Sequence, residues 1–152
     1  MSRIQLALNV SDLDAAIEFY SKFFKSEPAK VRAGYANFAI DEPPLKLVLI
    51  ANEGVPGSIN HLGVEVFSSD EVIDATTYLS GVGLATRVEE ATTCCFAVQD
   101  KVWVDGVDGS PWEVYTVLDD APASNSSEGD GTCCSSRIAE MASASDATSA
   151  CC

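Results

Sequence analysis

The chain has 152 residues, enough for one domain with a buried core. Its 47% hydrophobic content is typical of a globular protein, and its formal net charge of -14 argues against nucleic acid or an anionic membrane surface as a partner, because both require clustered Lys and Arg. The sequence shows no basic, apolar leader and no apolar run of membrane-spanning length, so we expect a cytoplasmic protein.

The first part of the chain predicts a strand, a helix and three further strands. Residues 4–10 alternate, with Leu6, Leu8 and Val10 on one face and Gln5, Ala7 and Asn9 on the other. Ser11, followed three positions later by Asp14, predicts the start of an amphipathic helix over about 12–25. Short apolar runs predict strands at 29–32, 35–40 and 45–51, with turns at Gly34 and 41–44.

A second segment repeats this order about 56 residues later. Residues 60–67 alternate like the first strand, with His61, Gly63 and Glu65 opposite an apolar face. Ser68 and Glu71 form a capping-box pattern before a helix that Gly81 and Gly83 end. Strands are predicted near 84–89, 96–104 and 112–118, separated by loops at 91–95 and 105–110. We expect two β-α-β-β-β modules, 2–51 and 58–118, whose two curled four-stranded sheets lie side by side around one cavity.

The composition changes at about residue 119. Residues 119–152 are mostly Ala, Ser, Asp, Gly and Cys, so the sequence predicts a domain over 1–118 and a low-complexity, disordered tail over 119–152. The six cysteines form adjacent pairs, and adjacent residues are too close for an ordinary disulfide, so each pair suits a soft, thiophilic atom. The pairs are Cys94-Cys95, Cys133-Cys134 and Cys151-Cys152. We expect the two tail pairs to have a dispensable, accessory role.

Three polar residues are candidate metal ligands. Gln5 and His61, the single histidine, occupy matching places in the repeat, and Glu113 alternates with Tyr115 in the last predicted strand. If the same cavity receives all three, the donors are an amide oxygen, an imidazole nitrogen and a carboxylate, similar to the facial triad of non-haem Fe(II) oxygenases. Taken singly, a histidine is more often structural, a strand-end glutamate is usually solvated, and Cys94-Cys95 can be two small buried residues.

The repeat and the segment from Trp103 to Tyr115, WVDGVDGSPWEVY, resemble the vicinal oxygen chelate superfamily of glyoxalases, bleomycin-resistance proteins and extradiol dioxygenases. The resemblance implies an α+β fold in which the two modules form a partly open, mixed β-barrel around a metal site. It places Gln5, His61 and Glu113 at three ligand positions. The fourth position, on residues 45–48, holds Lys46 or an apolar residue, which argues against glyoxalase chemistry.

Within that superfamily, these three residues and the loop ATTCCF at 91–96 resemble the ArsI-type carbon-arsenic lyases, which are also close to cadmium-induced proteins. The resemblance implies an Fe(II)-dependent dioxygenase that uses O2 to split trivalent organoarsenicals, such as methylarsonous acid and trivalent aromatic arsenicals, to arsenite. It assigns the metal to Gln5, His61 and Glu113 and the arsenical to Cys94 and Cys95. We expect a monomer or homodimer whose loop moves as a lid at Thr92 and Thr93.

Other functions compete with this enzyme. A non-catalytic cadmium-binding or arsenic-binding resistance protein needs the cysteines but not the three ligands. A drug-binding module of the bleomycin-resistance type needs neither. An extradiol catechol dioxygenase is disfavoured, because a chain with one histidine has none left as a separate acid-base residue.

Overall fold

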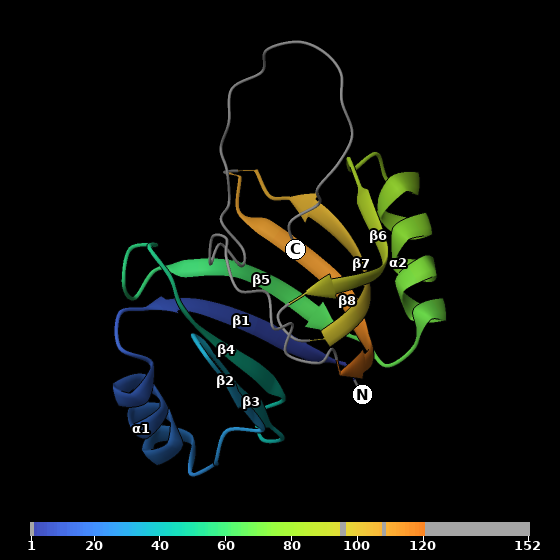
Figure 1. Cartoon of the computed structure of the whole chain (residues 1–152). Helices are drawn as coiled ribbons and strands as arrows, with labels where there is room; N and C mark the ends of the chain where they lie inside the picture. Colours follow the sequence, from blue (N-terminus) through green and yellow to red (C-terminus); the bar gives the residue numbers. More distant parts are fainter. Residues whose placement is uncertain (1, 95–96, 108, 121–152) are drawn as a thin grey trace.

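The computed structural model describes residues 2–94, 97–107 and 109–120. These ranges form a mixed α+β structure of eight strands and two helices (Figure 1). The elements in chain order are β1 (Arg3–Val10), α1 (Leu13–Phe24), β2 (Lys30–Arg32), β3 (Tyr35–Ile40), β4 (Leu45–Ala51), β5 (Ile59–Glu65), α2 (Ser69–Gly81), β6 (Arg87–Cys94), β7 (Ala97–Asp105) and β8 (Pro111–Asp120). The predicted repeat of two β-α-β-β-β modules is confirmed.

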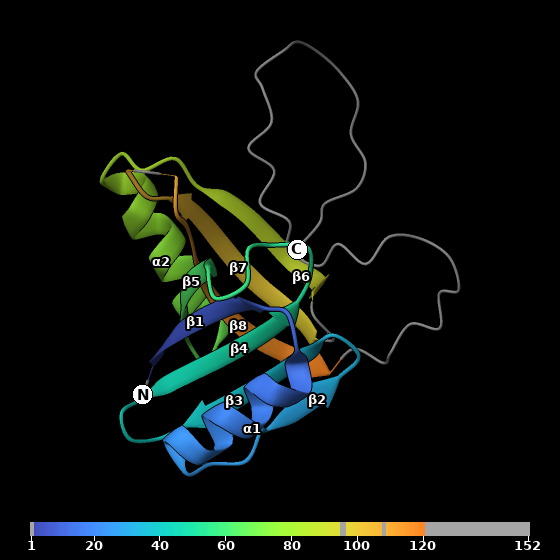
Figure 2. The ribbon, with the colours of Figure 1, turned by 90° about the vertical axis from the view of Figure 1, so that its left-hand side faces the viewer.

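The two four-stranded sheets predicted to lie side by side are joined edge to edge, so that all eight strands form one sheet in the order β2-β3-β4-β1-β5-β8-β7-β6. In each module the first strand pairs in parallel with the last, β1 with β4 and β5 with β8. The modules join where β1 and β5 pair in antiparallel fashion, which satisfies backbone groups that two separate edges would leave exposed. The sheet curls into a half-barrel, and the first strands of both modules lie at its centre (Figures 1 and 2).

Each helix covers the outer face of its own module (Figure 2). Below α1 lies an apolar cluster that includes Phe38, Leu47 and Leu49, against which Leu6 and Leu8 also pack. Below α2 a smaller cluster contains Val66, Val72 and Val102. The apolar faces predicted for the first and fifth strands therefore point to the helices, and their polar faces point to the concave side.

Both helices begin at a side chain that accepts a backbone hydrogen bond. Asp12 Oδ1 accepts from the Ala15 amide at 2.9 Å, so Asp12 caps α1 and the predicted role of Ser11 is wrong. Ser68 caps α2 as predicted, since its hydroxyl accepts from the Glu71 amide at 3.3 Å. The chain also leaves α2 as predicted, through Gly83 at a φ of +84°.

The segment predicted as a loop at 91–95 is largely strand. β6 continues to Cys94, and Thr92, Thr93 and Cys94 pair with Gln99, Val98 and Ala97 of β7. The pairing register shifts between Glu89 and Thr92, and Ala91 within this bulge has a φ of 46°. The alternating β7 sequence provides a partner strand long enough to extend β6, which the threonines and cysteines alone do not indicate.

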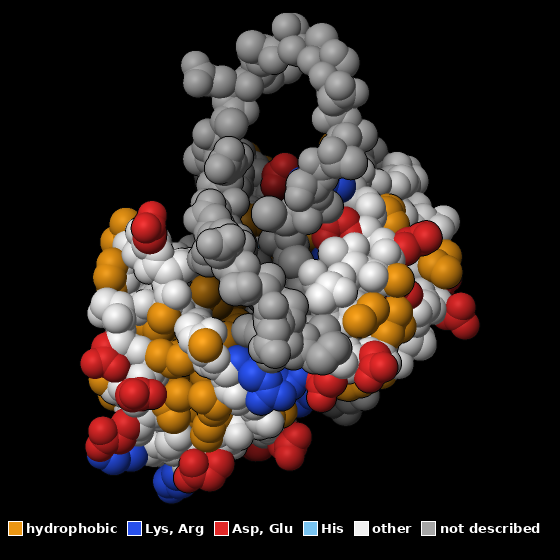
Figure 3. All heavy atoms as spheres, in the orientation of Figure 1, with side chains coloured by type: hydrophobic (Ala, Val, Ile, Leu, Met, Phe, Trp, Pro, Cys, Tyr) orange, Lys and Arg blue, Asp and Glu red, His pale blue; other side chains and the backbone are white. Residues whose placement is uncertain are grey.

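The strand β8 continues to Asp120, two residues beyond the predicted domain boundary at residue 118. The predicted tail from residue 121 onward, with its two cysteine pairs, lies outside the described residues. In the described part of the chain, neither helix has the length and apolar character needed to span a bilayer. Acidic side chains are spread over the visible surface of both modules (Figure 3).

Candidate metal centre

Gln5, His61 and Glu113 meet on the concave face of the sheet. They come from the adjacent strands β1, β5 and β8, where Gln5 pairs with Gly63 and Gly63 pairs with Glu113. All three side chains are buried, with 4%, 6% and 4% of their residue surface exposed, respectively. Because side chains alternate along a strand, His61 lies on the same face as Gly63, two residues away. The repeat thus brings its matching residues Gln5 and His61 together at the junction of the modules.

The polar atoms of the three side chains are within hydrogen-bonding distance or close to it. Gln5 Nε2 lies 2.6 Å from Glu113 Oε1 and 3.0 Å from His61 Nε2. His61 Nε2 and Glu113 Oε1 are 3.4 Å apart. Donor atoms that share a metal ion at about 2.1 Å stand roughly 3 Å apart, so this spacing is compatible with two ligands of one ion.

The protonation of His61 follows from its neighbours. Asn60 Nδ2 donates to Asn9 Oδ1 at 2.9 Å, which leaves Asn60 Oδ1 to accept from His61 Nδ1 at 2.7 Å. If Nδ1 carries the proton, Nε2 of the neutral ring has a free electron pair facing Gln5 and Glu113. A histidine that binds a metal through Nε2 commonly donates its other nitrogen in this way. The contacts of Asn60 and Asn9 are therefore compatible with His61 as a metal ligand.

The orientation of the Gln5 amide is set by Tyr115, which is 1% exposed. The Tyr115 hydroxyl donates to Gln5 Oε1, so Gln5 Nε2 donates to His61 and Glu113. Burial, reinforced by the negative charges of Glu65 and Glu113, raises the pKa of Tyr115 well above its usual value, so the hydroxyl retains its proton. For Gln5 Oε1 to act as a ligand, the amide has to turn over, and Nε2 then donates to the Tyr115 oxygen instead. A hydroxyl can serve both orientations, because it donates and accepts.

Gly63 provides the space in which Gln5 and Glu113 approach each other. A Cβ atom at this position would lie 2.9 Å from Glu113 Cγ and 3.5 Å from Gln5 Nε2. Any other residue would therefore push Glu113 away from its present place. The glycine is an inner-face residue of β5 and lies between the two ligand candidates in the sheet.

Lys101 neutralises the buried carboxylate of Glu113. The lysine is 1% exposed, and its Nζ donates to Glu113 Oε2 at 3.1 Å, which leaves Oε1 facing His61 and Gln5. Burial works to raise the pKa of Glu113, but His61, in the form that carries a proton on Nε2, and the Lys101 ammonium outweigh burial and hold the pKa below the usual glutamate value. Glu113 is thus a carboxylate at neutral pH, with one oxygen available for a cation.

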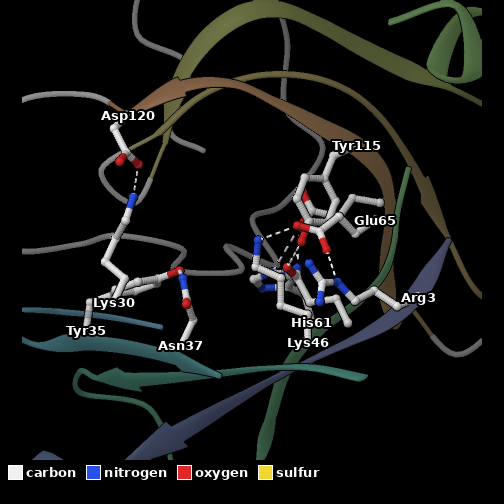
Figure 4. Close-up of polar contacts among 11 residues, drawn as sticks. Arg3, Lys30, Tyr35, Asn37, Lys46, His61, Glu65, Tyr115 and Asp120 are labelled. Atoms are coloured by element: carbon white, nitrogen blue, oxygen red, sulfur yellow. Dashed lines mark hydrogen bonds and ion pairs between the residues drawn. The ribbon is translucent and has the colours of Figure 1, made fainter. Parts of the chain in front are cut away.

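A second charged group lies beside this cluster (Figure 4). Glu65 accepts from Arg3, and its other oxygen accepts from Lys46 Nζ at 2.6 Å. Lys46, in the segment where the resemblance predicts a fourth ligand position, pairs with Gln5 in the register of β1 and β4, and its Nζ lies 5.3 Å from the centre of the Tyr115 ring. The cation at this position completes an ion triplet with Arg3 and Glu65. Lys46 therefore offers a paired cation, not a donor for a metal ion, beside the three ligand candidates.

The donor set fits a divalent metal that accepts nitrogen and oxygen. Within the described ranges, His, Cys, Asp and Glu alone form no group of three suited to a metal ion, so the amide of Gln5 is needed as the third donor. Imidazole, carboxylate and amide oxygen together suit Fe(II), and also Ni, Co or Zn. The cradle above Gly63 and the free electron pair of His61 support this fit.

Cys94, the described member of the predicted arsenical-binding pair, ends β6 and pairs with Ala97 at the start of β7. From Trp103, the partner of Glu113, to Ala97, the partner of Cys94, β7 advances six residues, about 20 Å at roughly 3.3 Å per residue. Only the backbone of Cys94 is described, and Cys95 lies outside the described residues. The structure therefore brings Gln5, His61 and Glu113 together but places the strand end bearing Cys94 away from them.

Several residues of the cluster were not predicted from the sequence. Lys101, Gly63 and Asn60 contact the ligand candidates or make room for them, and the sequence indicates Tyr115 only as a residue on the same face as Glu113. The alternation of Gln99, Lys101 and Trp103 in a predicted strand is the signal that indicates Lys101 as an inner-face residue. Neither Gly63 nor Asn60 has a comparable signal beyond its position next to His61.

Comparisons with known proteins agree with the fold and the repeat. Residues 3–114 match the family model described as the Glyoxalase/Bleomycin resistance protein/Dioxygenase superfamily. A solved relative, the Mn(II)-bound glyoxalase from Novosphingobium aromaticivorans, superposes with a TM-score of 0.57 at 20% identity, covering 80% of this chain and 42% of that one. At this identity the likeness shows the fold.

Two curated relatives are much more similar in sequence. The cadmium-induced protein CadI of Mycobacterium tuberculosis (strain ATCC 25618 / H37Rv) is 55% identical over 151 residues, covering 94% of this chain and 99% of the relative. The trivalent organoarsenical cleaving enzyme of Thermomonospora curvata is 54% identical over 152 residues, covering 99% and 100%. With the family match and the half-barrel fold, these similarities show that the chain belongs to the glyoxalase, bleomycin resistance protein and dioxygenase superfamily.

Proposed function

We propose that the protein is a non-haem Fe(II) dioxygenase that cleaves the carbon-arsenic bond of trivalent organoarsenicals and releases arsenite. The observation that carries the proposal is the buried cluster of Gln5, His61 and Glu113 at the junction of the modules. The 54% identity to an enzyme named for trivalent organoarsenical cleavage supports the substrate class. Methylarsonous acid and trivalent aromatic arsenicals are the expected substrates.

In this proposal Gln5, His61 and Glu113 hold the metal, and three protein ligands leave positions open for O2 and substrate. Bound Fe(II) would supply the activation of O2 beside the carbon-arsenic bond. Lys101 keeps Glu113 ionised and occupies its second oxygen, so the carboxylate offers Oε1 to the metal. Asn60 keeps the proton of His61 on Nδ1. Lys101 and Asn60 thus hold Glu113 and His61 in place, which lowers the reorganisation required of these two ligands on metal binding.

Cys94 and Cys95 bind the arsenic. Two thiols displace two hydroxyl groups from trivalent arsenic as water, leaving the carbon substituent attached. Because the strand end bearing Cys94 is distant from the cluster along β7, Thr92–Cys94 has to leave its pairing with β7 for the carbon-arsenic bond to reach the metal. The bulge between Glu89 and Thr92 is where we expect β6 to bend. In the cytoplasm, where we place the enzyme, both thiols stay reduced.

The deciding experiment follows arsenic speciation. The protein is loaded anaerobically with Fe(II), a trivalent methyl or aromatic arsenical is added, and air is then admitted. We expect arsenite only when Fe(II) and O2 are both present. Arsenical binding without arsenite release would refute the enzyme and favour a sequestering protein.

Substitutions test the two separate binding roles. His61→Ala is expected to lose Fe(II) binding while the arsenical still binds, because imidazole is a ligand of the metal only. Cys94→Ser and Cys95→Ser are expected to lose arsenical binding while Fe(II) still binds. Titration of each variant with Fe(II) and, separately, with the arsenical measures the two affinities. Loss of both Fe(II) and arsenical binding in every variant would contradict the division of roles.

The alternative is a non-catalytic resistance protein that binds cadmium or arsenic through its cysteines. The 55% identity to a protein named as cadmium-induced favours it. This function needs no metal at Gln5, His61 and Glu113, so His61→Ala would leave cadmium or arsenite binding and cellular resistance unchanged. Loss of resistance to organoarsenicals in that variant would favour the enzyme.

A further inference from the structure

Three buried polar atoms beside the metal cluster have no hydrogen-bond partner among the residues that the structure describes. They are Glu89 Oε2, Gln99 Oε1 and Trp103 Nε1, and among the described residues the one other such atom is Ser21 Oγ on α1. Gln99 and Trp103 are 9% and 7% exposed, and the side chain of Glu89 is 9% exposed. Buried polar groups are normally paired, so three such atoms on neighbouring strands indicate a place where something else supplies their partners.

The three residues share the inner face of β6 and β7. Gln99, Lys101 and Trp103 alternate along β7 and are all buried, and Glu89 of β6 pairs directly with Lys101. The Trp103 ring meets the His61 ring edge to face, with centres 5.6 Å apart and planes at 72°. Trp103 therefore connects this group of atoms to the metal cluster. Its backbone partner on β8 is Glu113 itself.

The unpaired atoms define the chemistry of a ligand. Glu89 Oε2 and Gln99 Oε1 accept hydrogen bonds, whereas the Trp103 indole nitrogen donates one. A neutral amino or hydroxyl group can donate to an oxygen and accept from the indole. A cationic group is disfavoured, because the Lys101 ammonium and the Arg87 guanidinium lie 5.3 Å and 5.7 Å from the centre of the Trp103 ring. A nitro group only accepts, so it would leave both oxygens unpaired.

We propose that Glu89, Gln99 and Trp103 recognise the organic substituent on arsenic and select an aromatic ring bearing a neutral amino or hydroxyl group. The inference rests on the proposed function and specifies its substrate class. Because removing the partner of a buried polar group costs more than an ordinary exposed hydrogen bond, the preference is expected to be at least about tenfold in affinity.

The test compares trivalent 4-aminophenyl, phenyl and 4-nitrophenyl arsenicals on the full chain loaded with Fe(II) under anaerobic conditions, where no turnover occurs. Calorimetric titration gives each affinity. We expect the aminophenyl compound to bind at least about tenfold more tightly than the phenyl compound, and the nitrophenyl compound no more tightly than phenyl. Equal affinities for aminophenyl and phenyl arsenicals would overturn the proposal.

Substitutions at the three residues test whether they cause the preference for the aminophenyl arsenical. Gln99→Met and Glu89→Gln keep side-chain size, and each is expected to lower the ratio of the aminophenyl to the phenyl affinity. Trp103→Phe removes the indole donor and is expected to do the same. Val88→Ala is the matched control, because Val88 is 47% exposed on the same strand as Glu89. An unchanged ratio in Gln99→Met and Glu89→Gln, with circular dichroism showing folded protein, would refute the assignment.

Admission of air at the end of each titration separates this proposal from the proposed function. Release of arsenite with equal affinities would refute the substituent preference and leave the enzyme intact. A tenfold preference without arsenite would establish the recognition site in a protein that binds arsenicals without cleaving them. Absence of binding by all three compounds would refute both.

Discussion

The Tyr115 hydroxyl donates to the amide oxygen of Gln5, and the amide nitrogen consequently faces His61 and Glu113. In this orientation the two N–H groups of the amide occupy the electron pairs of His61 and Glu113 that a metal ion would use. Metal binding then requires the amide to exchange its ends, with Tyr115 changing from donor to acceptor. Tyr115 is therefore a positioning residue for Gln5.

Tyr115→Phe is expected to weaken metal binding by about tenfold, because the turned-over Gln5 amide loses the partner of its N–H groups. Anaerobic titration with Fe(II), or with Co(II) followed by its absorption spectrum, measures the effect. Tyr35→Phe is the matched control, since Tyr35 is also a buried tyrosine, on β3, and its hydroxyl accepts from Asn37. Equal metal affinity in Tyr115→Phe and the unsubstituted protein would show that Tyr115 does not position Gln5.

Gly63→Ala is expected to abolish tight metal binding while the chain still folds. The added Cβ would lie 2.9 Å from Glu113 Cγ and 3.0 Å from the Glu113 backbone oxygen, so the carboxylate has to move. The strain is expected to cost about 1–3 kcal/mol of stability. Metal titration and urea denaturation measure the two effects. Gly81→Ala, at a position with nothing within 4 Å of the new Cβ, serves as control, and full metal affinity in Gly63→Ala would contradict the role of Gly63.

The ion triplet of Arg3, Lys46 and Glu65 predicts a dependence of stability on pH. Burial works to raise the pKa of Glu65, but Lys46 and Arg3 outweigh it and lower the pKa below 4.5. Because the folded state has the lower pKa, the contribution of Glu65 is fully present above its unfolded value and is lost as pH falls through the folded value. The stability difference between the unsubstituted protein and Glu65→Gln should therefore be largest near neutral pH.

Urea denaturation of both proteins from neutral pH down to about pH 3 measures this difference, and the other acidic groups cancel because the two chains share them. The difference should narrow as the pH falls below the ordinary glutamate value. A difference that stays constant over this range would mean that the charge of Glu65 contributes nothing to folding.

A chain ending at Asp120 tests the function of the cysteine-containing tail. The strand β8 reaches Asp120, and Gln5, His61 and Glu113 all precede this residue. We expect arsenite release per bound iron to be largely unchanged in this shortened protein. The measurement is single-turnover arsenic speciation at matched iron content, and a large fall in release would assign a catalytic task to the tail.

The secondary structure was largely predictable because its signals are local. Alternation identified β1 and β5, helical spacing identified α1, and Ser68 with Glu71 identified the start of α2. The single sheet was not predictable in the same way. The pairing of β1 with β5 is a long-range contact, and the sequence of either strand alone does not indicate its partner. The extension of β6 to Cys94 likewise depends on its partner β7 and not on its own residues.

The part of the candidate site that could be predicted is the part that the internal repeat and strand alternation indicate. Gln5 and His61 were found because they hold equivalent places in the two modules, and Glu113 because it alternates with Tyr115. The residues around them were not found, because their importance lies in cross-strand distances. The sequence around Lys101 does not distinguish it from a surface lysine, and its function follows only from the 3.1 Å distance between its Nζ and Glu113 Oε2. By its sequence, Gly63 is only a residue that disfavours a strand. Its importance follows from the lack of space for a Cβ atom beside Glu113.

The joining of the modules through β1 and β5 divides the candidate ligands unequally, with Gln5 on one module and His61 and Glu113 on the other. A chain in which one module has not yet formed, or has been lost to proteolysis, retains at most two of the three donors. Such a fragment cannot reproduce the complete cluster. If the metal reacts with O2 as we propose, this arrangement confines oxygen chemistry to the finished protein and protects the nascent or damaged chain from oxidising itself.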